Sequence, residues 1–408
     1  MKNAQDMEKS NRFLLWVFLV GISSAVCGAV YLAVLKRLFS WIGPDAWASN
    51  QMIHGLLLIA AGVLIVLIER WAGPSGNVEM LVDNIHEMGG NRDRKNLLSL
   101  IPSSLISIAV GGAMGPEAPL VQTTGSLGSW VSDIKRLSVS EKRTLTITGM
   151  AAGFTVLFGA PLGASLFALE ILHRRGMEYY ESLLPAIWGS LCGYVAYAVL
   201  TRMDLRPVWS FSYPIHALHL RDLVFSVLCG TLAALAAGAF IFFNRVFSRF
   251  FKALSPLVRG AAGGLILALL AFLSPYALTF GEYQMNGLAA ATPAASFLIL
   301  AFAAKFMGTS TTFSSGWKGG FIIPLFFMGA ALGRLLHLGF PAAQEVLLVA
   351  SFMAALNAGV TKTPLGSVLV VTEMTGIRIF PTTVLSVMTA MFLTSRIGLI
   401  ESQRPREN

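Results

Sequence analysis

Glu117 is a single carboxylate in a stretch of sequence that is otherwise apolar. The run from Leu97 to Met114 carries no charge, and the next charged residue after Glu117 is Asp133. A carboxylate inside a membrane segment costs free energy, so by default it indicates a functional site. The sequence therefore nominates Glu117 as an acid that takes part in the activity of the protein.

The residues around Glu117 indicate what kind of site this is. They read Gly115-Pro116-Glu117-Ala118-Pro119. Proline is favourable in the first turn of a helix and unfavourable inside one, so the carboxylate is expected where a helix begins, next to non-helical backbone. A helix start offers free N–H groups and the positive end of a dipole, which attract anions.

Composition predicts a membrane protein built from helices. The chain has 408 residues, of which 55% are hydrophobic and only 12% charged, and its mean hydropathy is +0.68. Soluble domains are about one quarter charged. Only helices or closed barrels satisfy the backbone in lipid, and these apolar runs are too long for the alternating strands of a barrel. We therefore expect an all-α polytopic membrane protein.

Charge and cysteine usage exclude other classes. The net charge is +9, but the basic residues cluster in short polar gaps between apolar runs, which is typical of loops and headgroup zones rather than of nucleic-acid binding. Cys27, Cys192 and Cys229 all lie in apolar runs and have neither disulfide nor metal-ligand spacing. We expect no metal and no cofactor.

The predicted organisation is one transmembrane domain over residues 13–400, after a polar segment 1–12 and before a short polar tail 401–408. Residues 13–35 are too long for a cleavable signal and predict a first spanning helix. No regulatory cytoplasmic domain is expected. We expect a multi-pass protein of the cell membrane, as in a bacterial inner membrane. The predicted spans are 13–35, 55–70, 97–114, 144–172, 183–200, 223–243, 259–273, 295–307, 321–339, 345–357, 364–375 and 380–394.

The chain contains an internal repeat. The pattern Gly115-x-x-x-Pro119-Leu120 recurs as Gly320-x-x-x-Pro324-Leu325, and Pro161-Leu162-Gly163 recurs as Pro364-Leu365-Gly366. The offsets differ by two residues, which predicts two repeats at about 13–200 and 223–400. Short, interrupted spans at matching places in two halves predict a transporter binding site near the membrane midplane.

These motifs resemble the CLC family of chloride channels and chloride/proton exchangers. Its three signatures correspond to Pro74–Val78, to Gly115–Pro119 and to Gly320–Pro324. Phe313-Ser314-Ser315-Gly316, Ala160-Pro161-Leu162 and Glu373-Met374-Thr375 match further family motifs, so the resemblance covers residues from about 73 to 394 in the correct order.

The resemblance implies two inverted repeats of broken, tilted helices, a homodimer with one pore per subunit, and bound chloride. It implies an anion site at the three signatures and a gating, proton-coupling role for Glu117. An ionised carboxylate occupies an anion position, and a protonated one leaves it; a nearby anion favours the protonated form. The implied anion-binding residues are Ser75, Gly76, Gly115, Pro116, Glu117, Ala118, Gly320, Phe321, Ile322 and Ile323.

The chain departs from the family pattern in several places. The first signature has Asn77-Val78 in place of Ile-Pro, and a second register places Pro74 rather than Ser75 at the serine position. In the third signature Ile322 replaces a phenylalanine, with Phe321 one place earlier. No tyrosine follows Tyr283, so the pore-lining tyrosine has no counterpart and the final helix is short or missing.

A further departure concerns the proton route. Ile171 stands where exchangers of the family often carry an intracellular glutamate, and isoleucine carries no proton. Glu170 is a candidate substitute, although the matching Glu373 in the second repeat favours a structural role for both. Lys305 lies in an apolar run, where it snorkels or pairs. Lys318 either attracts anions to the pore or is a solvated loop charge.

The leading functional hypothesis is anion transport, with chloride/proton antiport favoured over passive conduction because Glu117 is retained. A passive chloride channel and a fluoride-selective relative stay open. A membrane-embedded enzyme is disfavoured because no His-Glu-x-x-His motif and no nucleophile–base pair appear. Residues 78–96 predict an amphipathic helix at the membrane edge.

Overall fold

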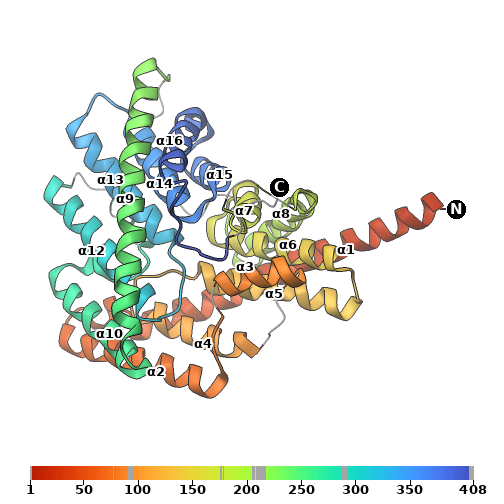
Figure 1. Ribbon diagram of the computed structural model, residues 1–408, viewed down its shortest axis with the longest axis horizontal. Helices are drawn as coiled ribbons and strands as arrows, with labels where there is room; N and C mark the ends of the chain where they lie inside the picture. The colour runs from red at the N-terminus through yellow and green to blue at the C-terminus, as the bar shows by residue number, and fades with distance from the viewer. Residues whose placement is uncertain are drawn as a thin grey trace.

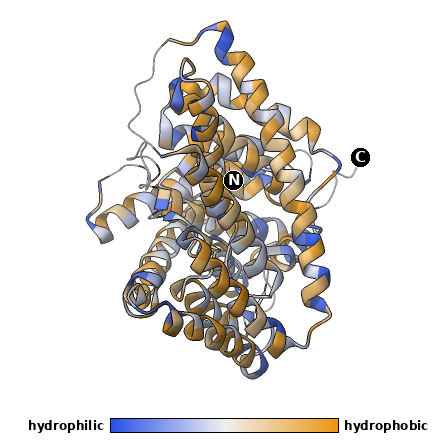
Figure 2. Ribbon diagram, turned by 90° about the vertical axis from the view of Figure 1, so that its left-hand side faces the viewer, coloured by the Kyte–Doolittle hydropathy of each residue, from blue (hydrophilic) through white to orange (hydrophobic). Residues whose placement is uncertain are grey.

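The computed structural model describes residues 2–403 apart from 77, 91–94, 175–176, 178, 205–206, 208–216, 283, 286–287 and 289–292. Within that part of the chain, seven helices are long and apolar enough to cross a membrane, and four apolar helices are shorter. Figure 2 shows apolar residues over most of the helical surface, as expected of a protein surrounded by lipid. The twelve predicted spans thus include several that are too short to cross alone.

The first half of the chain forms a set of helices that ends before residue 205 (Figure 1). These are α1 (Lys2–Ile42), α2 (Gln51–Ala72), α3 (Val78–Met88), α4 (Lys95–Ala109), α5 (Glu117–Lys135), α6 (Val139–Phe158), α7 (Pro161–Glu170) and α8 (Leu183–Thr201). Two single turns of 3₁₀ helix, η1 (Pro44–Trp47) and η2 (Tyr180–Ser182), precede α2 and α8.

The second half repeats this order. It contains α9 (Leu220–Lys252), α10 (Pro256–Leu273), α12 (Ala295–Ser314), α13 (Ile322–Gly339), α14 (Glu345–Thr361), α15 (Pro364–Thr375) and α16 (Phe380–Leu393), with short turns η3 (Pro275–Ala277) and η4 (Ile377–Ile379). In Figure 1, α9 runs the height of the molecule on one side and α1 projects from the other. The two longest helices therefore open the two repeats.

Packing between helices follows the repeat. In the first half α1 packs against α6 and α8, and in the second half α9 packs against α14 and α16. The halves meet where α2 contacts α10 and where α7 contacts α15. At the first contact, a Cβ on Gly62 would lie 2.0 Å from the carbonyl oxygen of Gly260. Only small residues allow helices to approach this closely.

Several predicted bounds differ from those of the helices, and three of the differences bear on the site. The span 144–172 is two helices, α6 and α7, because Gly159 takes a left-handed conformation (φ 64°) and Pro161 starts the next helix. The span 97–114 ends at Ala109, before a non-helical segment that leads to Glu117. The amphipathic helix predicted over 78–96 ends at Met88, and Asn96 belongs to α4.

One buried helix was absent from the predicted spans. Helix α5 carries many small and hydroxyl-bearing residues, so its apolar content is too low to stand out in the sequence. Its hydroxyl groups are satisfied within the helix: Thr123 Oγ1 donates to the carbonyl of Pro119 (2.7 Å), and Ser126 Oγ donates to that of Gln122 (2.7 Å). Such internal bonds let a polar sequence lie in the centre of a membrane protein.

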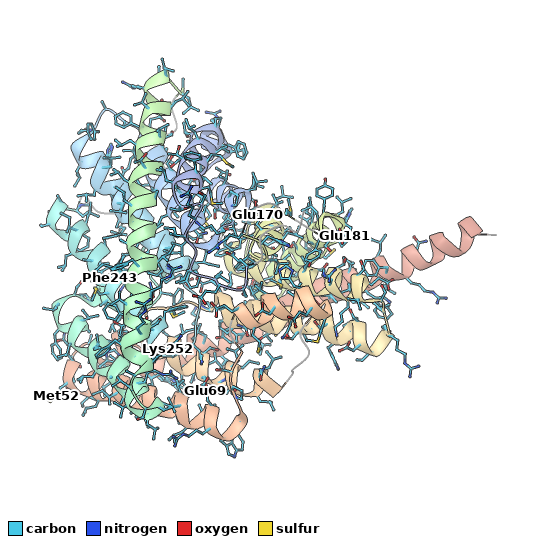
Figure 3. All side chains as sticks on the ribbon, in the orientation of Figure 1. Met52, Glu69, Glu170, Glu181, Phe243 and Lys252 are labelled. Carbon is cyan, nitrogen blue, oxygen red and sulfur yellow. The ribbon has the colours of Figure 1, made fainter. Side chains whose placement is uncertain are left out.

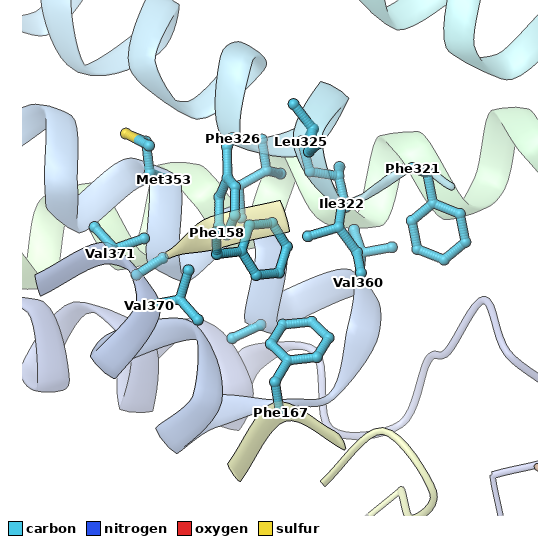
Figure 4. Packing of buried hydrophobic residues seen from close by; sticks show 14 of the residues in the cluster. Phe158, Phe167, Phe321, Ile322, Leu325, Phe326, Met353, Val360, Val370 and Val371 are labelled. Carbon is cyan, nitrogen blue, oxygen red and sulfur yellow. The ribbon is translucent and has the colours of Figure 1, made fainter. Parts of the chain in front are cut away.

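An aromatic cluster fixes the start of α13 against the first repeat (Figure 4). The ring of Phe158 at the end of α6 lies 6.5 Å from that of Phe167 in α7 and 5.9 Å from that of Phe326 in α13. All three side chains are fully buried. Because Phe326 follows Ile322 by one helical turn, this packing holds the first residues of α13 in place.

Candidate anion-binding and gating site

Two interrupted helices, one from each repeat, meet at a pair of glycines. The N–H of Gly115 donates to the carbonyl of Gly320 (2.7 Å), and the N–H of Gly320 donates to that of Gly115 (2.6 Å). The two backbone segments run antiparallel at this point and form a single isolated bridge. Helix α5 begins two residues after Gly115, and α13 begins two residues after Gly320. The N-terminal ends of both helices are thus brought to one place, as the repeat predicts.

The Glu117 carboxylate lies at this meeting point. Its side chain is fully buried, and its Oε1 accepts a hydrogen bond from the N–H of Ile323 in the first turn of α13 (2.5 Å). Its Oε2 has no hydrogen-bond partner among the described residues. A carboxylate from the first repeat therefore occupies the N-terminal end of a helix in the second repeat, where an anion would be stabilised.

Glycine is required beside this carboxylate. A Cβ on Gly115 would lie 2.1 Å from Oε2 of Glu117 and 2.8 Å from its Cδ. A Cβ on Gly320 would lie 2.8 Å from the same Oε2 and 2.9 Å from the backbone nitrogen of Ala118. Both glycines have ordinary negative φ, so the need here is for space and not for a special backbone conformation.

Cavities lie on both sides of Glu117. The first, which we call the α3-side cavity, has a volume of about 210 Å³ and contains Ala118 and Phe321 in its wall, together with Gly76 and Lys318. The second, which we call the α1-side vestibule, has a volume of about 310 Å³. Its wall contains Pro116, Ile323, Lys36, Tyr197 and Glu282.

Glu117 lies between these two spaces. Pro116 and Ala118, the chain neighbours of Glu117, line opposite cavities, and so do Ile323 and Phe321. A third, smaller cavity of about 30 Å³ lies against Ala118 and Ile322 and reaches Ile171. The fully buried carboxylate of Glu117 lies among these spaces.

The first signature enters the site through Gly76. Gly76 lines the α3-side cavity, whereas the Ser75 hydroxyl donates to Oε1 of Glu69, which Figure 3 labels at the end of α2. The same Oε1 pairs with Lys318 Nζ (2.8 Å). Lys318 is therefore an ion-paired residue in the cavity wall. Asn77, the departure in this signature, lies outside the described residues.

Glu170 and Glu373 cap helices of the opposite repeat. Glu170, labelled in Figure 3, accepts hydrogen bonds from the N–H groups of Leu365 (3.1 Å) and Gly366 (2.8 Å) at the start of α15. In return, Glu373 accepts one from the N–H of Gly163 (2.8 Å) at the start of α7. This exchange supports the structural interpretation of both glutamates, because each carboxylate accepts from otherwise free N–H at the start of a helix.

Lys305 is fully buried, so it does not snorkel, and its side chain forms no ion pair among the described residues. Its Nζ donates to the carbonyls of Leu278 and Thr279 (2.7 Å each) and to Oε1 of Gln284 (2.8 Å). Three acceptors use all three of its N–H bonds. The lysine thereby holds the segment between η3 and α12, which carries Glu282 into the wall of the vestibule.

Two parts of the site were not predicted from the sequence. Leu399 and Ile400, which follow the last helix, line the α3-side cavity. Gln403 is buried, and its Nε2 donates to the carbonyls of Ile171 (3.0 Å) and Thr361 (2.7 Å). Lys36 and Glu282 in the vestibule were also missed, because both are far from any signature in the sequence.

The repeated broken helices, the carboxylate between two cavities and the helix starts around it define a membrane transport protein for anions. The chain belongs to the CLC family: the family model described as voltage gated chloride channel matches residues 57–395. Proteins of this family are transporters and channels of the membrane and not enzymes, so this chain is a multi-pass membrane protein of the same kind.

Individual relatives agree with this assignment. The chain is 28% identical, over 95% of its length and 86% of the relative, to a chloride/fluoride channel protein of Pseudomonas syringae. It is 30% identical, over 90% of its length and 91% of the relative, to the voltage-gated ClC-type chloride channel ClcB of Salmonella dublin.

Two solved structures share the fold. One is a CLC-type fluoride/proton antiporter, with a TM-score of 0.86, 23% identity, and coverage of 97% of this chain and 98% of that chain. The other is a slow cyanobacterial Cl⁻/H⁺ antiporter, with a TM-score of 0.82, 21% identity, and coverage of 94% and 95%. The predicted CLC-type fold is confirmed.

Proposed function

We propose that this protein exchanges a monovalent anion, chloride in the first instance, for protons, and that Glu117 is the gate that couples the two. The observation that carries the proposal is the position of its carboxylate, which is buried between two cavities and bound to the N–H of Ile323. An anion that passes between the cavities needs the place that the carboxylate occupies.

Coupling follows from competition for one position. The ionised carboxylate and a passing anion both seek the helix N-terminal N–H groups, and two like charges in a buried site exclude each other. Protonation removes the charge of Glu117 and weakens its hydrogen bond with the N–H of Ile323. The anion then takes the position, and the proton leaves when the carboxylate returns. Signature residues Gly76, Ala118, Phe321 and Ile322 surround the path on the α3 side.

The α1-side vestibule favours anion entry. Lys36 supplies positive charge to its wall, which raises the local anion concentration. Glu282 in the same wall offers a carboxylate that can exchange protons with water. We further propose that chloride is the ion bound at the signature residues, that no other cofactor takes part, and that two chains form a homodimer with one pathway each.

Fluoride is a second candidate for the transported anion. The first signature departs from the family pattern at Asn77-Val78, and relatives named for fluoride occur among both the sequences and the structures. Passive anion conduction without proton coupling is a third hypothesis. It is favoured by Ile171, whose side chain in the wall of the small cavity cannot carry a proton. One assay separates the three.

The assay reconstitutes the purified protein into liposomes and records anion and proton movement together. Under a chloride gradient we expect protons to move uphill; anion flux without proton movement would leave the passive reading. Repeating the assay with fluoride ranks the two anions. Glu117→Gln mimics the protonated gate without its exchangeable proton, so it should transport anions at a rate independent of pH and move no protons. Full coupling in this variant would remove Glu117 from the gate.

A further inference from the structure

A cluster of titratable side chains lies where α3 ends. The Nδ1 of His86 and the hydroxyl of Tyr179 are 2.8 Å apart, and the ring of His173 stands edge-on to that of His86 with centroids 4.9 Å apart. The guanidinium of Arg143 lies over the ring of Tyr179 at 4.2 Å. His173 is almost fully buried, and His86 and Tyr179 are partly buried. The gating scheme gives these groups no role.

Hydrogen bonding fixes which nitrogen of His86 carries the proton. Its Nε2 lies 2.8 Å from the carbonyl oxygen of Leu172, which only accepts, so Nε2 is protonated in the neutral ring. The Nδ1 is then the basic atom, and it accepts the proton of the Tyr179 hydroxyl. The basic nitrogen therefore faces a group that both donates and accepts protons, which is the arrangement that a proton relay requires.

Residues close to the cluster along the chain line the small cavity next to Glu117, and others are exposed. Val82, one helical turn before His86, and Ile171, two residues before His173, both line this cavity of about 30 Å³. Its opposite wall contains Ala118 and Ile322, which flank the buried carboxylate of Glu117. On the outer side, Glu87 next to His86 is exposed, and so is Tyr180 next to Tyr179.

We propose that His86, His173 and Tyr179 form the station through which protons reach Glu117 from the α3 side. This inference rests on the proposed proton-coupled function and supplies its proton route. A cavity of this volume has room for about one water molecule, which can carry a proton between the histidines and the carboxylate. Because its wall is almost entirely apolar, the water enters only transiently.

The proton is conserved at each step. Solvent protonates the oxygen of Tyr179 as its own hydroxyl proton passes to Nδ1 of His86, so the tyrosine ends neutral and the imidazole positive. The imidazolium keeps the new proton on Nδ1 and gives its Nε2 proton to a water in the cavity, either directly or through His173. The water passes a proton to the carboxylate of Glu117, which becomes neutral, and rotation of the now neutral imidazole restores the starting tautomer of His86.

Arg143 makes this station one that releases protons. It faces the cluster from α6, while His173 and Tyr179 face His86 from the segment after α7, and Asp83 and Glu87 lie near His86 on α3 itself. The guanidinium also donates to the carbonyls of Ile85 (3.2 Å) and His86 (3.3 Å). A fixed positive charge this close to His86 disfavours a long-lived imidazolium.

The test compares proton and anion flux in the same liposomes for His86→Gln, His173→Gln and Tyr179→Phe. Glutamine keeps an N–H for the carbonyl of Leu172 but cannot carry a proton at neutral pH. We expect the proton flux of His86→Gln to fall about 100-fold, the lower end of what a positioned acid–base group contributes. Anion flux should persist, because Glu117 still exchanges protons with the α1-side vestibule.

His337→Gln is the matched control. His337 also bonds a backbone carbonyl through a ring nitrogen (Ala343, 3.1 Å), but it lies near the end of α13 and does not belong to the cluster of His86, His173 and Tyr179. Its proton-to-anion flux ratio should equal that of the wild type. Should the glutamine variants fail to fold, Tyr179→Phe keeps the ring contact with Arg143 and removes only the hydroxyl relay, so it decides alone.

The outcomes separate the two proposals. If the wild type moves no protons, the proposed exchange function fails, and the route fails with it. If the wild type couples and the variants keep its proton-to-anion ratio, the histidine station is refuted and the gate at Glu117 stands. A lower ratio in the variants, with the control unchanged, supports the station.

Discussion

The Glu117 carboxylate is bound to the N–H of Ile323, a position that we call its seat. Gly115→Ala is the substitution that tests most directly whether this seat controls anion passage. The added methyl carbon would lie 2.1 Å from Oε2 and 2.8 Å from Cδ of Glu117. Among its nearest neighbours are only atoms of this one carboxylate, which is the movable end of a side chain. Because φ of Gly115 suits alanine, the backbone has no reason to shift. The carboxylate must leave its seat instead.

The size of the effect follows from the bond that is lost. The hydrogen bond from Ile323 N–H to a charged carboxylate contributes about 1.5–3 kcal/mol. Since about 1.4 kcal/mol corresponds to a factor of ten, the population of the seated carboxylate falls by about 10- to 100-fold. Anion flux at neutral pH should rise toward the level that the wild type reaches in acid, and its pH dependence should flatten.

The measurement is anion efflux from liposomes at neutral and acidic pH. Gly339→Ala serves as the control, because a Cβ at Gly339 meets nothing within 4 Å and the residue ends the same helix that starts at the site. Wild-type flux and pH dependence in Gly115→Ala would refute the idea that this seat is the gate. A block at every pH would refute it as well, since the methyl group would then replace the carboxylate as the obstruction.

Three further substitutions test the framework around the site. Glu170→Ala removes the acceptor for two helix N–H groups and should lower stability by about 1–2 kcal/mol, whereas Glu373→Ala removes one and should cost about half as much. Thermal unfolding in detergent measures both, and a fall in the proton-to-anion ratio of Glu170→Ala would instead make that residue a proton carrier. Lys305→Met leaves three buried acceptors without a donor and should cost about 3 kcal/mol; an unchanged unfolding temperature would show that water replaces the ammonium group.

Sequence reasoning predicted the central features of the site because they depend on local chemistry. A carboxylate next to two prolines in an apolar run has few explanations, and the structure places Glu117 at the first residue of α5. The repeat of Gly115 and Gly320 predicted that two broken helices share one site, and these glycines pair directly. The anion-binding roles of the signature residues stay predictions, as does the gating role of Glu117.

Polar contacts that form only when the chain folds were beyond the sequence. Ser75 was nominated for its hydroxyl, but only the fold brings Glu69 within its reach. Lys305 was expected to reach the membrane surface or to form an ion pair, since nothing in the neighbouring sequence predicts that three carbonyl-type oxygens converge on it. Helix α5 was overlooked because hydropathy does not register hydroxyl groups that bond within their own helix. Each failure concerns a polar group whose partner is supplied by folding.

The reciprocal capping by Glu170 and Glu373 bears on how such a molecule could have arisen. Each half closes the exposed amide ends of the other, so a chain of half this length would enter the bilayer with unsatisfied donors. A single-unit ancestor could remain in lipid only by pairing with a copy of itself in the opposite sense. Joining two such units end to end would make that partnership permanent, and it would allow a carboxylate such as Glu117 to be kept in one unit only, against the first turn of α13 in the other.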